Sequence, residues 1–310
     1  MSRIAFLFPG QGSQAVGMGR DFHQRSPLAR ELYATADGAL GYPISRISFE
    51  GPEPELRLTA NAQPALLVAG VVAARLLGLE PAVAAGHSLG EYCAMVEAGA
   101  LGFEDAVVLV HKRGGYMQEA VPAGRGAMAA ILGVPGEEVR RALGAVRSGV
   151  VDIANWNSED QTVISGEKAA VEEAIALINP PRSVMLPVSG PFHSRLMAPA
   201  AARLAADLDA VAFHDLRFPV ITNVDARPIR TAAEAREALK RQVTQSVLWT
   251  KTMDALRQLG IEACVELGPG KVLTGLVKRA GRGWDKPPAC YNVEDWAGLE
   301  RTRAALSGLL

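Results

Sequence analysis

Cysteine is scarce in this 310-residue chain, and the few that occur are not spaced as metal ligands or as disulfide pairs. Cys93, Cys264 and Cys290 are odd in number, lie far apart and belong to no CxxC or CxxH motif. A disulfide framework needs an even set of cysteines, and a zinc site needs closely spaced ligand pairs. We therefore expect three reduced thiols and no metal site.

A surplus of charge of either sign is also missing. The 32 Lys and Arg residues oppose 33 Asp and Glu residues, which gives a formal net charge of -1. Proteins that bind nucleic acid through its phosphates rely on a basic field that recruits the ligand. We therefore expect no nucleic-acid partner for this chain.

Long hydrophobic runs are absent as well. The most apolar stretch, Pro64 to Leu79, is interrupted by Arg75 and is shorter than the roughly 20 residues that a membrane span needs. The first apolar run, Ile4–Phe8, is too short for a signal peptide and is followed by Pro9-Gly10 rather than a cleavage site. We expect a cytoplasmic protein without a membrane partner.

What the sequence does contain is an alternation of short apolar runs and longer helical patterns. The short runs are bounded by glycine and proline and have the length of strands, at Ile4–Phe8, Ala82–Ala85, Val220–Thr222 and Ala263–Leu267. The helical patterns are Thr59–Leu77, Phe103–Ala120, Ser194–Leu208, Ala232–Thr244 and Lys251–Leu259. Strands that alternate with helices predict an α/β fold with a mainly parallel sheet covered on both faces.

The middle of the chain follows a different order of elements. The patterns there predict strand, helix, strand, strand, helix and strand at 127–132, 136–146, 151–154, 162–165, 169–178 and 183–187. This βαββαβ order is the ferredoxin-like arrangement. We therefore expect residues 124–191 to form a ferredoxin-like domain inserted into a larger domain of residues 1–123 and 192–310.

The strongest local signal is the GxSxG motif Gly86-His87-Ser88-Leu89-Gly90, between an apolar run and a helix-forming segment. In such a turn the glycines allow close backbone approach, and the strained backbone exposes the serine hydroxyl. The helix N-terminus places backbone N–H groups, led by that of Leu89, where an oxyanion would develop. A bare GxSxG also occurs by chance. In this strand-turn-helix context it predicts a nucleophile, Ser88, in an α/β-hydrolase-like large domain.

A serine nucleophile needs a base, and His193 is the candidate among five histidines. It lies in a turn before a predicted helix and downstream of Ser88, the order found in α/β-hydrolase sites. His87 is the neighbour of Ser88, so its side chain should leave the turn in another direction. On position alone, a histidine in an ordinary helix-capping loop is an equal alternative for His193.

These motifs resemble those of the malonyl-CoA:acyl-carrier-protein transacylases of type II fatty acid synthesis and of some polyketide pathways. The similar segments run along nearly the whole chain, at Phe8–Gln14, Gln63–Ala65, Gly86–Tyr92, Arg113–Ala120, Gly126–Met128, Ala154–Ser158, Pro191–Ser194 and Glu266–Leu273. The resemblance implies a monomeric acyltransferase that moves malonyl from coenzyme A to acyl carrier protein. Malonyl-CoA is then a substrate, and no cofactor is expected.

The resemblance also implies a role for each residue of the catalytic group. Ser88 is the nucleophile, and His193 is the general base. Gln11 contributes to the oxyanion hole together with the N–H of Leu89. No Asp or Glu stands out as the third member of a triad, and in this family a backbone carbonyl, here that of Gln242, holds the imidazole instead.

Recognition of the malonyl carboxylate falls to Arg113 by the same resemblance. A guanidinium fork suits a bidentate anion better than a point charge does. Without the resemblance, an arginine on a solvated helix face would be the more ordinary interpretation. Phe192 and Leu89 are the types typical of malonyl-selective members. We expect the other residues of the substrate cleft to be Met117, Met128, Asn155 and Asn157, with core packing an equal alternative for both methionines.

Two other functions remain open from sequence. A thioesterase would use the same serine turn, since transfer and hydrolysis differ in how well water is excluded. A non-catalytic module that binds carrier protein is the second alternative. The presence of Arg113 and Gln11 argues against the first, and the presence of both Ser88 and His193 argues against the second.

Overall fold

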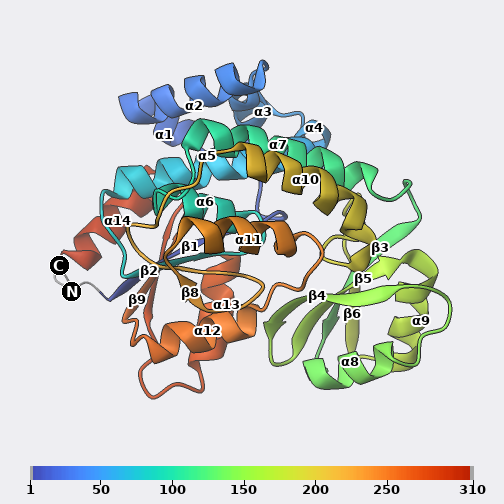
Figure 1. The fold of residues 1–310 in the computed structure, drawn as a ribbon. Coiled ribbons are helices and arrows are strands. Elements are labelled where there is room, and N and C mark those ends of the chain that lie inside the picture. Colours follow the sequence, from blue (N-terminus) through green and yellow to red (C-terminus); the bar gives the residue numbers. More distant parts are fainter. Residues whose placement is uncertain (1–2, 308–310) are drawn as a thin grey trace.

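The computed structural model describes residues 3–307, whose strands form two separate sheets (Figure 1). The larger sheet has six strands in the order β10-β9-β1-β2-β7-β8. Their bounds are β1 Ile4–Phe8, β2 Val83–Gly86, β7 Val220–Ile221, β8 Pro228–Ile229, β9 Ala263–Leu267 and β10 Ala289–Val293. All neighbours pair in parallel except β7 and β8. The predicted α/β class with a mainly parallel sheet is confirmed.

Strand β1 lies at the centre of this sheet and is buried on both faces, which explains its unbroken apolar run. Ile4, Phe6 and Phe8 pack on one face of the sheet, and Ala5 and Leu7 pack on the other. Successive side chains of a strand point to opposite faces, so five residues serve two cores.

Helices cover both faces of the larger sheet (Figure 1). The face toward Phe6 carries α5 Thr59–Leu77, α6 Gly90–Glu97, α7 Phe103–Glu119, α10 Ala198–Ala210, α11 Ala232–Gln242 and α14 Trp296–Leu306. Four N-terminal helices follow, namely α1 Arg20–Arg25, α2 Pro27–Leu40, α3 Ile44–Glu50 and α4 Glu53–Arg57. Helix α2 packs on both α5 and α7, α3 and α4 pack on α5, and α1 packs on α2. The opposite face carries α12 Trp249–Gln258 and α13 Val272–Gly281.

Helix α5 is long and apolar enough, at 19 residues, to cross a membrane by length and composition. The structure buries 83% of its most apolar window inside the protein. It packs against α6 and α7, and its buried side chains belong to the same hydrophobic core as Phe6 and Phe8 of β1. Its bounds are those predicted from the sequence, and its burial is that of a core helix.

The smaller sheet is antiparallel, with the order β4-β5-β3-β6. Its elements are β3 Gly126–Leu132, α8 Gly136–Leu143, β4 Val151–Ser158, β5 Gln161–Glu167, α9 Lys168–Ile178 and β6 Arg182–Met185. The predicted βαββαβ order of elements is confirmed. Ile131, Val139, Ile164 and Val171 belong to a hydrophobic core of its own.

Backbone hydrogen bonds of Val247, which lies between α11 and α12, join the smaller sheet to the part of the chain that carries the larger sheet. Its N–H donates to the Ala154 carbonyl over 2.8 Å, and its carbonyl accepts from the Trp156 N–H over 2.9 Å. The edge strand β4 is thereby extended by a short parallel bridge. This bridge fixes β4 against the segment that follows α11.

Two sequence predictions need correction at helix starts. The predicted helix from Ser194 is wrong there, since residues Arg195–Met197 form a 3₁₀ turn and α10 begins at Ala198. Pro199 lies in the first turn of α10, the place where a helix tolerates its missing N–H. Helix α12 begins at Trp249, two residues before the predicted start.

Candidate active site

Ser88 lies at the turn between β2 and α6 with a positive φ of 50°. The glycines on either side are required by space rather than by flexibility. A Cβ on Gly86 would lie 1.9 Å from the Gly90 carbonyl carbon, and a Cβ on Gly90 would lie 2.0 Å from the Phe8 oxygen. The strained strand-to-helix turn that the GxSxG motif predicted is present in the structure.

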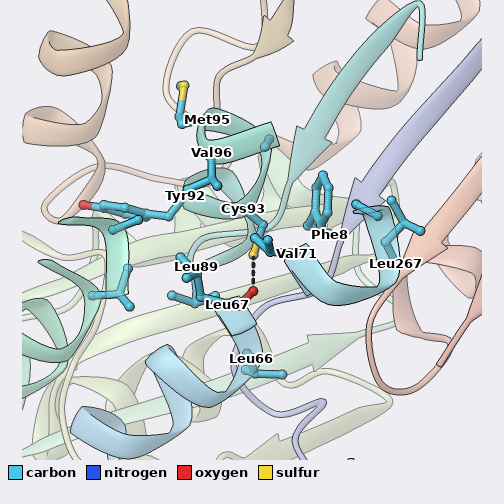
Figure 2. Packing of buried hydrophobic residues seen from close by; sticks show 14 of the residues in the cluster. Phe8, Leu66, Leu67, Val71, Leu89, Tyr92, Cys93, Met95, Val96 and Leu267 are labelled. Carbon is cyan, nitrogen blue, oxygen red and sulfur yellow. Dashed lines mark hydrogen bonds between the residues drawn. The ribbon is translucent and has the colours of Figure 1, made fainter. Parts of the chain in front are cut away.

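The helix below Ser88 is fixed by the main core (Figure 2). Leu89, Tyr92 and Cys93 are buried against side chains of β1 and α5, and the Cys93 thiol lies 3.9 Å from the Leu67 carbonyl. Cys93 is unpaired, as are Cys264 and Cys290. Rigid packing of this helix holds the nucleophile in place while the substrate side stays open.

His193 contacts the nucleophile directly. Its Nε2 lies 2.7 Å from Ser88 Oγ, although 105 residues separate the two in sequence. Its Nδ1 lies 2.9 Å from the Gln242 carbonyl and 3.1 Å from the Gln245 carbonyl. Carbonyl oxygens only accept, so Nδ1 carries the proton and Nε2 presents its lone pair to Ser88. The structure thus places His193 at the serine rather than in an unrelated loop.

The environment of His193 favours the neutral ring. The side chain is 4% exposed, and this burial, followed by the Arg113 guanidinium, lowers its pKa from 6.5 to about 3. The carbonyls of Gln242 and Gln245 oppose the shift without reversing it. A neutral imidazole at physiological pH is ready to accept the Ser88 proton.

Arg113 is 1% exposed, so the ordinary interpretation of a solvated helix arginine is wrong. Its Nη1 donates to Gln63 Oε1 over 2.7 Å. Its Nη2 donates to Ser88 Oγ over 3.1 Å and to Gln242 Oε1 over 3.0 Å. Within residues 3–307 its buried Nε has no hydrogen-bond partner. The guanidinium is therefore fixed beside the nucleophile with a donor unused.

Two buried residues that were not predicted as site residues, Asn223 and Glu91, support the serine turn through hydrogen bonds. Asn223 accepts from the Ser88 N–H over 2.7 Å and donates to the Gly86 carbonyl over 2.6 Å. Glu91 Oε2 accepts from Gln242 Nε2 over 2.7 Å and from the Asn223 N–H over 3.0 Å. Asn223 follows β7 at the carboxyl edge of the sheet, which is a signal that could have identified it.

A cavity of about 280 Å³ opens above Ser88. Its walls include Ser88, His193, Arg113 and most residues predicted for the cleft, namely Gln11, Leu89, Met117, Met128, Asn155 and Phe192. Met128 and Asn155 come from the smaller sheet. A larger hollow of about 620 Å³ touches His193 from the other side but does not include Ser88, so the smaller cavity holds the chemistry.

Asn157 differs from its prediction, because it is not among the residues that line the cavity. Its Oδ1 lies 2.9 Å from His87 Nε2 instead. His87 lines the cavity, but its Nε2 is engaged by Asn157 and not by Ser88, and burial lowers its pKa. Asn157 therefore contacts the neighbour of the nucleophile and is not part of the cavity wall.

Gln11 lies in the loop after β1 and is held at the cavity wall. Its Nε2 donates to Thr59 Oγ1 over 3.2 Å, and that hydroxyl lies 3.0 Å from Ser189 Oγ. A Cβ on Gly10 would lie 2.5 Å from the His87 carbonyl, so only glycine lets this loop approach the serine turn so closely. Within the described chain, no group of three or more His, Cys, Asp or Glu residues is arranged to hold a metal ion.

Comparison with known proteins places this geometry in a family. A family model described as an acyl transferase domain matches residues 5–297. The chain is 47% identical over 290 residues to a malonyl CoA-acyl carrier protein transacylase of Bacillus subtilis, covering 91% of this chain and 92% of the relative. The solved structure of such a transacylase from Coxiella burnetii has a TM-score of 0.94, with 40% identity and 98% of each chain covered.

A further solved structure is similar to the same extent. It is a malonyl-transacylase in complex with a type II PKS acyl-carrier protein, with a TM-score of 0.94 and 41% identity. The match covers 97% of this chain and 99% of that one. The likeness therefore extends over both sheets.

Proposed function

The chain belongs to the malonyl CoA-acyl carrier protein transacylase family, and we propose from this premise that Ser88 carries malonyl from coenzyme A to acyl carrier protein. The acceptor is the phosphopantetheine thiol of the carrier, which supplies fatty acid or polyketide synthesis. One observation carries the proposal. Ser88 Oγ lies 2.7 Å from His193 Nε2 and 3.1 Å from Arg113 Nη2 at the wall of one cavity.

Acylation begins with a proton transfer. His193 Nε2 accepts the proton of Ser88 as Oγ attacks the thioester carbonyl, and the ring returns it to the leaving coenzyme A sulfur. The N–H of Leu89, at the start of α6, and the amide of Gln11 receive the oxyanion. In the second half the carrier thiol attacks the malonyl ester, and the same groups act in reverse order.

The Gln242 carbonyl replaces the carboxylate of an ordinary triad. It fixes the His193 tautomer through a 2.9 Å bond but brings no negative charge. The imidazolium that forms in the transition state is therefore short-lived and returns its proton quickly. A thioester has a good leaving group, so a base of low pKa suffices for this chemistry.

Arg113 accounts for the choice of a malonyl group. The Nη2 that contacts Ser88 offers a charged donor to the substrate carboxylate beside the nucleophile. Nη2 is released from Ser88 Oγ when that oxygen becomes an ester. Phe192 lies in the same cavity wall and would crowd a methyl branch, a difference worth about 1–3 kcal/mol.

The proposal extends to the organisation of the chain. Residues 1–123 and 192–310 form the catalytic unit, and residues 124–191 form the inserted ferredoxin-like unit. Support comes from the separate core of the smaller sheet and from Met128 and Asn155, which reach into the cavity. We propose a monomer, since a single chain supplies every residue of the mechanism, and the proposed steps call on no cofactor.

A cytoplasmic location is also part of the proposal. Cys264 on β9 and Cys290 on β10 occupy directly paired positions, and both are free thiols. Free neighbouring thiols are typical of a reducing compartment.

Transfer and hydrolysis are distinguished by their products. Labelled malonyl-CoA is incubated with the enzyme and holo acyl carrier protein, and free malonate is measured against malonyl-carrier protein. We expect the label on the carrier protein. Release of most of the label as malonate would indicate a thioesterase instead.

A further inference from the structure

Glu91 is a buried carboxylate that the proposed mechanism does not use. It lies in the first turn of α6, three residues after the nucleophile, and its exposed fraction is 0%. Oε2 accepts bonds from Gln242 and Asn223, while Oε1 is buried and has no hydrogen-bond partner within residues 3–307. A buried carboxylate with an unused oxygen is costly as an anion unless a counter-charge is near.

The counter-charge is Arg113, and the side-chain amide of Gln242 bridges the two groups. Arg113 Nη2 donates to Gln242 Oε1 over 3.0 Å. Gln242 Nε2 donates in turn to Glu91 Oε2 over 2.7 Å. The amide thus turns its negative end to the guanidinium and its positive end to the carboxylate. An amide in this orientation stabilises both charges without direct contact between them.

The remaining charged groups around Glu91 cancel or stay neutral. Asp225, after β7, is paired with Arg241 of α11 through bonds of 2.9 Å and 2.6 Å. Tyr92 on α6 has its pKa raised to about 12 by burial, and His193 is neutral for the reasons given above. His87 is likewise buried with a lowered pKa. The buried charge of the empty site is therefore set by Glu91 and Arg113, and it sums to zero when Glu91 is ionised, above about pH 7.

A substrate carboxylate on Arg113 disturbs this balance, because it adds a second negative charge to a site with one positive group. We propose that Glu91 is the buried counter-charge of Arg113 and takes up a proton when the malonyl carboxylate binds that arginine. The proton comes from solvent, is held on Oε1 and returns to solvent when the malonyl group leaves. This inference rests on the role of Arg113 in the proposed function.

The sign of the pH dependence follows from linkage. Burial is the main cause that raises the pKa of Glu91 to about 7 in the empty site, and a bound anion raises it further. Below about pH 7 the Glu91 carboxyl is already protonated, so the enzyme takes up few further protons when malonyl binds. Above about pH 7, Glu91 takes up one proton for each malonyl group that binds. The affinity for malonyl-CoA then falls by up to about tenfold for each unit by which the pH rises.

Calorimetry with a variant that binds but does not react tests the proposal. Ser88→Ala is titrated with malonyl-CoA near pH 8 in phosphate and in Tris buffer, whose ionisation enthalpies differ. The difference in heat gives the protons taken up. We expect uptake approaching about one proton per malonyl-CoA. Acetyl-CoA shares the coenzyme but lacks the carboxylate, so we expect its binding to be accompanied by no proton uptake.

The matched variant is Ser88→Ala with Glu91→Gln, which keeps an acceptor for Gln242 and Asn223 but cannot titrate. We expect it to bind malonyl-CoA without proton uptake and with an affinity that is constant between pH 7 and pH 9. In the otherwise native enzyme, Glu91→Gln should likewise abolish the rise of the malonyl-CoA KM with pH. A merely structural role would lower kcat and leave that pH dependence in place.

The outcomes separate the two proposals. If Ser88→Ala binds malonyl-CoA no more tightly than acetyl-CoA, the role of Arg113 in the proposed function fails. If it prefers malonyl-CoA but takes up no proton, or takes up the same number with Glu91→Gln, the inference about Glu91 alone is overturned. If Glu91→Gln does not fold, the absence of proton uptake by Ser88→Ala with malonyl-CoA still overturns the inference, and uptake with malonyl-CoA but not with acetyl-CoA still supports it.

Discussion

Gln242 contacts four other residues of the site at once, although it is not expected to touch the reacting atoms. Its backbone carbonyl holds His193, its side-chain carbonyl holds Arg113, and its amide donates to Glu91 and to the backbone carbonyl of Ser88. The family resemblance supplied only the backbone role. The side-chain contacts could not be predicted, because they join positions as much as 154 residues apart and depend on how α6, α7 and α11 pack.

Loss of Arg113 should change the substrate preference of the enzyme. Arg113→Ala removes the partner of the malonyl carboxylate, so kcat/KM for malonyl-CoA should fall by about 30-fold or more. Activity with acetyl-CoA should fall less. Arg113→Lys is the control, since it keeps the charge but not the fork and should retain part of the preference. Unchanged malonyl-CoA turnover in Arg113→Ala would refute this role.

The depressed pKa of His193 predicts an unusual pH profile. Because burial keeps the ring neutral down to about pH 3, the single-turnover acylation rate at saturating malonyl-CoA should stay constant from pH 8 to pH 5. An inflection near the ordinary pKa of 6.5 would contradict this account. In stability the sign is the same: the contribution of the buried neutral ring is complete above pH 6.5 and is lost as the pH falls toward 3.

At the scale of elements, the helices and strands with the clearest apolar pattern in the sequence were the ones predicted. The buried strands β1 and β2 are unbroken apolar runs, and β9 is an apolar run interrupted only by Glu266. These three strands and the βαββαβ order were predicted from the sequence. Helix α2 was not among the predicted elements, although Ser26 caps it, Pro27 begins it and Gly41 ends it with a φ of 72°. Strand β10 was also missed, because much of it is only partly buried and its pattern is weak.

Because α6 approaches β1 closely, position 90 leaves no room for a side chain larger than that of glycine. A Cβ there would lie 2.0 Å from the Phe8 oxygen, so Gly90→Ala should destabilise the fold by about 1–3 kcal/mol or more and displace the serine turn. Gly275→Ala in α13 is the control. No atom lies within 4 Å of the Cβ it adds, and a helix gains about 1 kcal/mol from alanine. Thermal unfolding of both variants checks the prediction, and equal stabilities would contradict it.

At the scale of the whole molecule, the site exists only where the two sheets meet. The larger unit supplies the nucleophile, the base and the arginine, while Met128 and Asn155 of the smaller sheet close the cavity. The Val247 bridge to β4 fixes this junction. Sequence patterns predicted the two units separately. The cleft was predicted together with Met128 and Asn155 in its wall, but its shape could not be, because that shape depends on packing between distant segments.

The central claim is that Ser88 is acylated by malonyl and passes the group on. Intact-mass spectrometry after brief incubation with malonyl-CoA tests it most directly, followed by addition of holo acyl carrier protein. We predict one malonyl adduct per chain, located on the Ser88 peptide, lost to the carrier protein on its addition and absent from Ser88→Ala. An adduct that persists in Ser88→Ala, or malonyl transfer by that variant at the native rate, would contradict the account.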